Sequence, residues 1–452
     1  MYDGSKTTAK MSMSNHPRAY GTAAIALAFA AGILLTLGFK DLYPDLERRY
    51  QRRRGQNTSS SDSRPRSTYL PAVKLEDHTR SLRPPAVSPP IPEGIEGCIG
   101  NTPLFKIRSL SEVTGCTILA KAEFLNGAGG SPKDRVALNM IRMAEEEGLL
   151  APGRGDTIYE GTVGSTGISL ATLARALGYK AHICMPNDQS QEKSDLLHHL
   201  GAEVERVTPA PITSTEHFVN LARRRAAEHT ASGEDESRGF FADQFESLAN
   251  YRAHLKTTGP EIWQQTGGQI DALVAGAGTG GTVSGISKYL KEDMGMRRTL
   301  KVVLADPEGS GLYNKVKHGV MFSPTEKEGT RRRQQVDTIV EGIGINRLTE
   351  NFETGRELVD DAVKVTDLQA LKMARWLVEK DGIFVGSSSA VNCVAAVVTA
   401  LRMPKESRVV TILCDSGTRH LSKFWKKVGE LELEEGHEET GLLALLNVEV
   451  ER

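Results

Sequence analysis

The chain lacks the features that mark several common classes of protein. Its five cysteines are odd in number, scattered and without a C-x-x-C pair, which argues against a disulfide framework and favours a reducing compartment. It has no H-E-x-x-H sequence and no cluster of carboxylates and histidines at ligand spacing, so we predict no bound metal. The net charge of −1 provides no global field that would attract nucleic acid.

Charge is also missing from residues 19–39, which read AYGTAAIALAFAAGILLTLGF. About 20 such residues cross a bilayer as a helix, and the run is longer than the apolar part of a cleaved secretory signal, which is the alternative. More Lys and Arg follow the run than precede it, so the positive-inside tendency places the rest of the chain in the cytosol. We expect an N-terminal segment over 1–18, a single transmembrane helix over 19–39 and a flexible linker rich in Pro, Ser and Arg over 40–92.

From residue 93 onward, apolar β-rich segments alternate with helical ones, a pattern typical of an α/β fold with parallel strands covered by helices. Three of the predicted strands end in loops of Gly, Ser and Thr before a helix: EGTVGSTG, AGAGTGGT and VGSSSA. Such loops meet at the carboxyl edge of a sheet, where helix N-termini offer N–H donors to anions. Each loop alone is compatible with a simple turn, but the three together predict one anion-binding site.

A lysine stands in the first turn of the helix predicted after NGAGGSPKDR, residues 126–135. Ser131 is typical of an N-cap and Pro132 of the first helical position. The helix dipole disfavours an ammonium group at this end by roughly 0.3–1 kcal/mol. Lys133 is therefore either a solvated cation beside Asp134 or an amine that is kept neutral so that it can form an imine with a carbonyl.

The loop GAGTGGT, residues 276–282, also satisfies the G-x-G-x-x-G pattern, and Asp306 ends the next apolar run as a ribose-binding acid would in a dinucleotide fold. The close packing of Gly280, Gly281 and Thr282 suits a terminal phosphate better than a bridging pyrophosphate. An NAD-dependent dehydrogenase is therefore a distant alternative, and it gives no reason for the lysine.

Nine motifs occur in order from about residue 93 to about 428: NTPLFKI, GGSPKDRVALNM, EGTVGSTGISLA, QFESLANYRAH, AGAGTGGT, ADPEGS, EGIG, VGSSSA and CDSGTRHLSKFW. Together they resemble the cysteine synthase and cystathionine β-synthase family of pyridoxal-phosphate enzymes. With the apolar N-terminal run, the chain resembles the fungal mitochondrial-type members of that family. The resemblance also implies a homodimer and a location at the mitochondrial outer membrane.

The resemblance implies a two-lobed pyridoxal-phosphate fold of type II, similar to the β subunit of tryptophan synthase. The catalytic domain would extend over 93–428, with a smaller lobe mainly over 127–246, a larger lobe mainly over 247–428, and a C-terminal tail over 429–452.

The resemblance further implies a role for each site residue. Lys133 would be the catalytic lysine, which carries pyridoxal 5'-phosphate as a Schiff base and moves the α-proton of the substrate. Ser388 would face the pyridine nitrogen, and Ser165 would also contact the cofactor. The phosphate would lie on Gly278, Thr279, Gly280, Gly281 and Thr282. The α-carboxylate of the substrate would lie on Thr162, Ser165, Thr166 and Gln244.

The implied activity is β-replacement of the acetoxy group of O-acetyl-L-serine by sulfide, giving L-cysteine and acetate. Two alternatives stay open: homocysteine as the acceptor, as in cystathionine β-synthase, and a membrane-anchored protein that binds the cofactor with weak activity. The second arises because Val163 and Ser165 replace polar residues of the family's T-S-G-N-T-G loop, which removes hydrogen bonds worth about 0.5–1.5 kcal/mol each. Two charged stretches, 209–238 and 321–335, are typical of solvated insertions.

Overall fold

The computed structural model describes residues 91–189, 191–232, 236–321, 338–431 and 441–447. The predicted N-terminal segment 1–18, the predicted anchor 19–39 and the linker up to residue 90 lie outside the described residues. Within the described ranges, no helix is both long and apolar enough to cross a bilayer.

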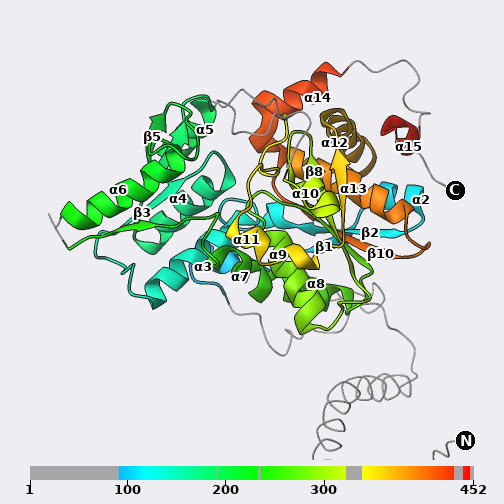
Figure 1. The fold of residues 1–452 in the computed structure, drawn as a ribbon, viewed down its shortest axis with the longest axis horizontal. Coiled ribbons are helices and arrows are strands. Elements are labelled where there is room, and N and C mark those ends of the chain that lie inside the picture. The colour runs from blue at the N-terminus through cyan, green and yellow to red at the C-terminus, as the bar shows by residue number, and fades with distance from the viewer. Residues whose placement is uncertain (1–90, 190, 233–235, 322–337, 432–440, 448–452) are drawn as a thin grey trace, which may run out of the picture. The chain divides into compact units, whose positions relative to one another are not determined.

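A six-stranded sheet forms the larger lobe (Figure 1). Its strand order is β1-β2-β10-β7-β8-β9, and only β1 runs antiparallel to its neighbour. Parallel neighbours require crossover connections, which the helices between the strands provide. The strands are β1 Leu104–Lys106, β2 Thr117–Ala122, β7 Ala272–Gly276, β8 Lys301–Pro307, β9 Asp361–Val365 and β10 Arg408–Leu413.

A four-stranded parallel sheet of order β5-β4-β3-β6 forms the smaller lobe. All five residues of β3 are buried, as is typical of a parallel strand that is covered on both faces. The strands β1 and β2 precede residue 127 and belong to the six-stranded sheet. The strands of the smaller lobe are β3 Thr157–Gly161, β4 Lys180–Pro186, β5 Glu203–Val207 and β6 Gly239–Phe241.

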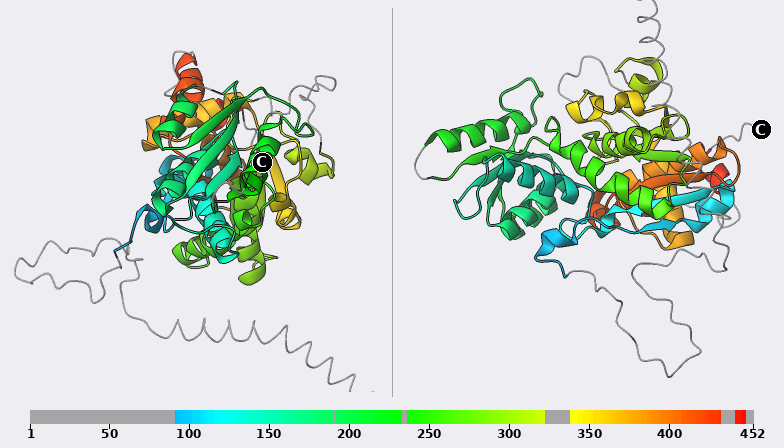
Figure 2. Two further views of the ribbon diagram at one scale, coloured as in Figure 1. Left: turned by 90° about the vertical axis from the view of Figure 1, so that its left-hand side faces the viewer. Right: turned by 90° about the horizontal axis from the view of Figure 1, so that it is seen from below.

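Helices cover both sheets (Figure 2). The helices before β7 are α2 Arg108–Thr114, α3 Lys133–Glu146, α4 Ser165–Leu177, α5 Gln191–His199, α6 Phe218–Ser232, α7 Ala249–Lys256 and α8 Thr258–Thr266. Those after β7 are α9 Gly281–Lys288, α10 Leu312–His318, α11 Glu350–Glu353, α12 Asp367–Asp381, α13 Ser387–Leu401, α14 Lys426–Glu430 and α15 Leu442–Leu445. Short 3-10 turns lie at Ile95–Cys98, Glu123–Leu125, Arg356–Leu358 and Gly417–His420, and π-helical turns at Tyr289–Asp293 and Leu421–Trp425.

The helix α13 is the centre of the larger lobe's core. It is apolar around nearly its whole circumference and is buried almost throughout, as expected for a helix that is enclosed by other elements. It packs against α12 on one side and against β7, β8, β9 and β10 on the other. The opposite face of the sheet carries a second apolar cluster, to which α8 and α9 contribute. The start of α13 is thereby fixed relative to the carboxyl ends of these strands.

One predicted strand is not present. Residues 383–386, all of them described, form only an isolated antiparallel bridge between Val385 and Ser416. The N–H of Gly386 donates to the carbonyl of Asp415, and the N–H of Gly417 donates to the carbonyl of Phe384. The prediction was wrong because this short connection satisfies its backbone groups on the turn at Ser416 instead of in a ladder. The junctions from β3 to α4 and from β7 to α9 are confirmed.

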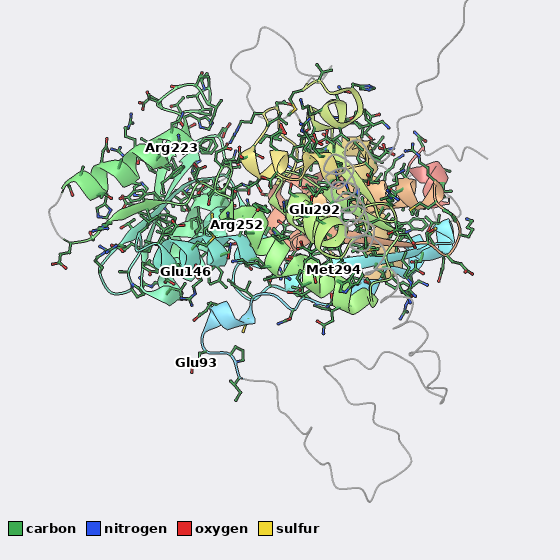
Figure 3. The ribbon with its side chains drawn as sticks, turned by 60° about the horizontal axis from the view of Figure 1, so that its bottom comes forward. Glu93, Glu146, Arg223, Arg252, Glu292 and Met294 are labelled. Atoms are coloured by element: carbon green, nitrogen blue, oxygen red, sulfur yellow. The ribbon has the colours of Figure 1, made fainter. Side chains whose placement is uncertain are left out.

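The stretch 209–238 is also different from the prediction. Its helix α6 packs against β3, β4 and β6. Val219, Ala222 and Ala226 recur on one face of α6 and are buried, while charged residues such as Arg223, labelled in Figure 3, lie on the exposed face. The interpretation as a solvated insertion was therefore wrong for α6. The second stretch, 321–335, lies outside the described residues except for residue 321.

A buried ionic network holds α3 against the larger lobe. The guanidinium of Arg135 donates to both oxygens of Glu123 at 2.8 Å and to Glu261 Oε1 at 2.6 Å. Lys121, which is fully buried, donates to Glu261 Oε2 at 2.6 Å and to the Thr102 carbonyl at 2.5 Å. Burial alone would raise the pKa of Glu123, but the Arg135 guanidinium brings it down from 4.5 to about 2. Both carboxylates are therefore charged and paired at neutral pH.

Arg135→Met is expected to cost about 3–5 kcal/mol of unfolding free energy at neutral pH, because it leaves the buried Glu123 carboxylate without its partner. Urea unfolding measures this cost. The control is Arg142→Met in the same helix, since the Arg142 side chain is 48% exposed and its ion pair with Glu145 is worth about 0.2–1 kcal/mol. Equal losses of unfolding free energy in the two variants would contradict the conclusion that Arg135 pairs with buried carboxylates.

The same variant gives a pH test. The folded-state pKa of Glu123 lies below its ordinary value, so its contribution is present above pH 4.5 and is lost as the pH falls toward 2. The stability difference between wild type and Arg135→Met should therefore narrow over that interval.

Candidate active site

Lys133 is the first residue of α3, which confirms that the lysine stands in the first helical turn. Its N–H donates to Ser131 Oγ at 3.2 Å, the bond an N-cap side chain makes. Burial lowers the pKa of the Lys133 amine, and the nearby Cys414 and Asp415 offset this lowering only in part. In the part of the chain that the structure describes, no carboxylate forms an ion pair with this amine.

Asp134 does not pair with the lysine. Its carboxylate accepts hydrogen bonds from the N–H groups of Gly129 and Gly130, each at 2.8 Å, and from Ser169 Oγ at 2.6 Å. The aspartate therefore shapes the glycine-rich loop before α3. Of the two hypotheses for Lys133, this geometry favours the neutral amine over the solvated cation.

The glycines between β7 and the start of α9 have no room for side chains. Gly280 has φ 87°, in the left-handed region that favours glycine, and it precedes the first residue of α9. A Cβ at Gly278 would come within 2.4 Å of the Gly342 carbonyl, and one at Gly281 within 2.0 Å of Asn250 Oδ1. The backbone at the start of α9 is therefore bare, which leaves its N–H groups and the positive end of the helix dipole available to an anion.

Two threonine hydroxyls of this loop are held from α7. Asn250 Nδ2 donates to Thr279 Oγ1 at 2.9 Å, so the Thr279 hydroxyl proton is free to donate to a ligand. His254 Nε2 lies 3.2 Å from Thr282 Oγ1. Burial lowers the pKa of His254 to about 3, and the positive charge of Arg135 contributes to this lowering. His254 is therefore neutral, and it is close to both Lys133 and the glycine loop.

Ser388 and Lys133 share a neighbour on the other side. Ser388 lies in the first turn of α13, is buried and hydrogen-bonds to the thiol of Cys414. Burial raises the pKa of Cys414 to about 12, so the thiol is protonated at neutral pH. Cys414 and Asp415 are the two neighbours whose negative forms would raise the pKa of the Lys133 amine.

Three of the predicted carboxylate-binding residues, Thr162, Ser165 and Thr166, lie at the start of α4, and the fourth, Gln244, follows β6 and contacts Thr166. Thr166 Oγ1 donates to Gln244 Oε1 at 2.5 Å, and the N–H of Gly164 donates to Thr162 Oγ1 at 3.3 Å. The carbonyl of Gln244 accepts from Asn250 Nδ2 at 2.8 Å. Since Asn250 also donates to Thr279, this group is joined by hydrogen bonds to the glycine loop.

Sequence reasoning missed a cation at this site. Arg419 Nη1 donates to Ser165 Oγ at 3.3 Å, across 254 residues of chain. The motif CDSGTRHLSKFW contains Arg419, but no spacing in the sequence connects it with Ser165. Asn250 and His254 were missed for the same reason, although both lie in or next to the motif QFESLANYRAH.

A chain of polar side chains connects the two lobes beside the site. Lys193 of α5 lies 3.1 Å from Glu341 of the larger lobe, and Lys423 lies 3.6 Å from the same carboxylate. Glu341 Oε2 is 3.7 Å from His420 Nδ1, and His420 Nε2 is 3.0 Å from Asp415 Oδ2. The chain therefore runs from the smaller lobe to the aspartate whose charge acts on the amine.

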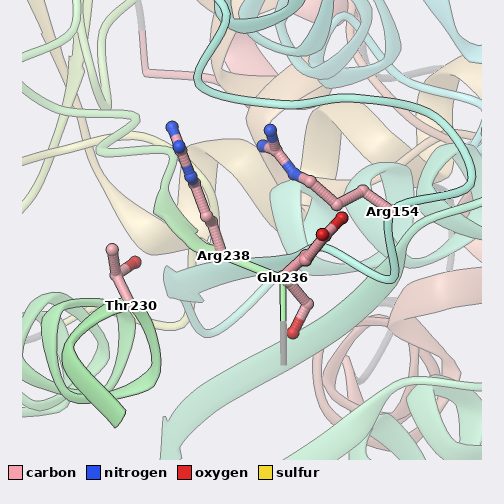
Figure 4. A pocket seen from close by; sticks show the side chains of 5 residues that line it. Arg154, Thr230, Glu236 and Arg238 are labelled. Atoms are coloured by element: carbon pink, nitrogen blue, oxygen red, sulfur yellow. The ribbon is translucent and has the colours of Figure 1, made fainter. Parts of the chain in front are cut away.

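A surface hollow of about 500 Å³ lies elsewhere on the smaller lobe (Figure 4). It lies at the amino ends of β3 and β6, whereas the loop that starts α4 follows the carboxyl end of β3. It is therefore separate from the candidate active site. Its lining residues are Arg154, Thr230, Glu236, Ser237 and Arg238.

These residues fit pyridoxal phosphate. The glycine loop packs closely against Gly342, Phe352 and Asn250, and it presents N–H groups and threonine hydroxyls that suit a phosphate dianion. A buried amine with a lowered pKa lies near it and can bond to an aldehyde. Fold and site together define an α/β enzyme of the pyridoxal-phosphate type.

The comparisons with known proteins agree. Residues 95–415 match the family described as pyridoxal-phosphate dependent enzyme, and the chain belongs to this family. It is 71% identical over 436 residues to cysteine synthase 2 of Neurospora crassa, which covers 94% of this chain and 95% of that protein. It is 55% identical over 340 residues to a Saccharomyces cerevisiae protein named provisionally as a mitochondrial cysteine synthase, with 75% and 86% covered. The solved structure of an O-ureido-L-serine synthase aligns with TM-score 0.64 at 30% identity, over 77% of this chain and 99% of that one.

Proposed function

We propose that the chain is a cysteine synthase, which replaces the acetoxy group of O-acetyl-L-serine by sulfide and releases L-cysteine and acetate. The observation that carries the proposal is the buried amine of Lys133, whose pKa burial lowers, near the glycine loop at residues 278–282, with His254 close to both. The names of the Neurospora and Saccharomyces relatives support the choice of reaction.

The cofactor would be held at both ends by this chain. The phosphate would lie on the loop before α9, and the Ser388 hydroxyl would offer the pyridine nitrogen an uncharged partner. When bound, pyridoxal phosphate withdraws electrons from the α-carbon of the substrate, which allows the acetoxy group to leave from the β-carbon. The phosphate-binding residues are Gly278, Thr279, Gly280, Gly281 and Thr282.

Lys133 would move the α-proton. Burial lowers the pKa of its amine, which favours the unprotonated Nζ that can accept the proton from the substrate and later return it. A base in this position contributes roughly 10²–10⁴ in rate. The charge of Asp415 favours the ammonium that forms in between.

The α-carboxylate of the substrate would bind at the start of α4, where the helix dipole and four polar side chains favour an anion. Arg419, which donates to Ser165, adds a positive charge there. The positive charge of Arg419 would compensate for the hydrogen bonds to the carboxylate that the Val163 side chain cannot make. The four side chains are those of Thr162, Ser165, Thr166 and Gln244.

Lys133→Ala tests the proposal. The wild type should be yellow, borohydride should fix the cofactor onto Lys133, and cysteine should form from O-acetylserine and sulfide. The variant should bind cofactor without fixation and lose at least about 100-fold in rate, as expected for removal of a general base. Lys180→Ala, an exposed lysine of β4, is the control and should behave like the wild type. A colourless wild type, or full activity of Lys133→Ala, would overturn the proposal, and product formation only with homocysteine would change the acceptor.

We also propose that substrate binding draws the two lobes together and that the Lys193 to Glu341 ion pair stabilises the closed form. Lys193→Gln should raise the KM for O-acetylserine about 2- to 5-fold, as expected for a partly exposed pair worth about 0.5–1 kcal/mol. Lys423→Gln removes the same charge from the same carboxylate, but from within the larger lobe, and should leave KM unchanged. Equal changes of KM in the two variants would show that the charge near Glu341 determines KM and that contact between the lobes does not.

Residues 19–39 are proposed to anchor a homodimer in the mitochondrial outer membrane, with the catalytic part in the cytosol. Hydropathy and flanking charge support the anchor, and the name of the Saccharomyces relative supports the organelle. Protease added to intact mitochondria should digest the catalytic part, and carbonate should not extract the chain. Full protection from protease would contradict this placement, and sedimentation as a monomer in detergent would contradict the dimer.

A further inference from the structure

Four chemically reactive side chains gather on one face of the four-stranded sheet, under α6. His182 and Cys184 belong to β4, and Glu203 and Glu205 belong to β5. The parallel register pairs His182 with Glu203 and Cys184 with Glu205. Because side chains two residues apart in a strand point to the same face, all four share this face. The mechanism proposed above uses none of them.

Three of these side chains have the donor atoms and the spacing of a metal site. One atom each of His182, Cys184 and Glu205 lie within 4.8 Å of one another. The distance from His182 Nε2 to Glu205 Oε2 is 3.2 Å, and that from Cys184 Sγ to the same oxygen is 4.0 Å. In a tetrahedral zinc site, bonds of about 2.0–2.3 Å place ligand atoms about 3.3–3.7 Å apart. Small side-chain movements therefore suffice to bring the three to a common ion.

The surrounding groups support the same interpretation. His182 Nδ1 lies 3.3 Å from Glu203 Oε2, and a carboxylate on the second ring nitrogen is the usual support of a histidine that binds zinc. The ring of Tyr159 stacks on His182 with centroids 5.0 Å apart, which fixes the plane of the imidazole. Arg225 of α6 donates to Glu205 Oε1 at 2.9 Å and to Oε2 at 3.1 Å. The carboxylate has further lone pairs, so Arg225 can remain on Oε1 while Oε2 turns to an ion.

We propose that His182, Cys184 and Glu205 bind a borderline-soft divalent cation, zinc foremost, with water in the fourth position. One nitrogen, one sulfur and one oxygen donor suit zinc and do not suit magnesium or calcium, which prefer oxygen alone. The thiol is buried, whereas the Glu205 side chain is 27% exposed on the edge strand β5, which gives the ion a route from solvent. The sequence predicted no metal because the ligands come together only through strand pairing.

The experiment uses the full chain with its cofactor and without an affinity tag. After treatment with a chelator, the protein is titrated calorimetrically with Zn²⁺, and Co²⁺ is added separately as a spectroscopic probe. One Zn²⁺ should bind per chain, and Co²⁺ should give a thiolate charge-transfer band. Cys184→Ser should lose both, while Cys116→Ser should keep both. Cys116 is a matched control, since it is a buried thiol of the larger lobe that contacts two backbone carbonyls at 3.4 Å.

Two further variants keep the test decisive if Cys184→Ser does not fold. Glu205→Gln changes a partly exposed side chain and should also abolish stoichiometric binding. Glu203→Gln removes only the partner of the histidine and should weaken binding about 10- to 100-fold. Failure of the wild type to bind one Zn²⁺, or unchanged binding in Glu205→Gln, would overturn the proposal. Each outcome is independent of cysteine synthesis, because none of these residues belongs to the candidate active site.

Discussion

The burial of one amine at the start of α3, with no carboxylate paired to it in the described part of the chain, is the constraint on which the active site depends. Burial and the helix dipole both act against a cation at this point, so the pKa of the amine lies below its ordinary value. The next two residues in the chain, Asp134 and Arg135, have structural roles. Asp134 binds the N–H groups of the preceding loop, and Arg135 fixes the helix end to the buried carboxylates of the larger lobe. Three consecutive residues therefore provide the buried amine, the shape of the preceding loop and the attachment of α3 to the larger lobe.

The sequence could predict what depends on local pattern. The start of α3 and the junctions at β3 and β7 follow from capping residues, glycine loops and apolar periodicity, and all three are present. The strand expected at residues 383–386 fails because its composition is equally suited to a short extended connection, and only tertiary pairing with Ser416 decides between them. The helix α6 was misjudged because average charge hides an apolar stripe, which appears only when residues are placed on helical faces.

Contacts between distant segments could not be predicted in this way. Arg419 reaches Ser165, and Lys193 reaches Glu341, across more than a hundred residues of chain in each case. Neither pair leaves a periodic or compositional trace in a single sequence. The cluster of His182, Cys184 and Glu205 could not be predicted for the same reason. His182 and Cys184 are two residues apart in β4, and only the register of β5 brings Glu205 beside them.

Asn250 shows why the cofactor and substrate regions act as one unit. Its amide nitrogen donates both to the carbonyl of Gln244 and to the hydroxyl of Thr279, and its Oδ1 lies where a side chain at Gly281 would have to be. A shift of the glycine loop therefore moves Gln244, and Gln244 in turn holds Thr166 at the start of α4. An anion that fixes the loop would therefore also hold the residues predicted to bind the carboxylate. A single buried amide thus has its hydrogens committed both to the glycine loop and to the segment that contains Gln244, which joins the two predicted sites by hydrogen bonds.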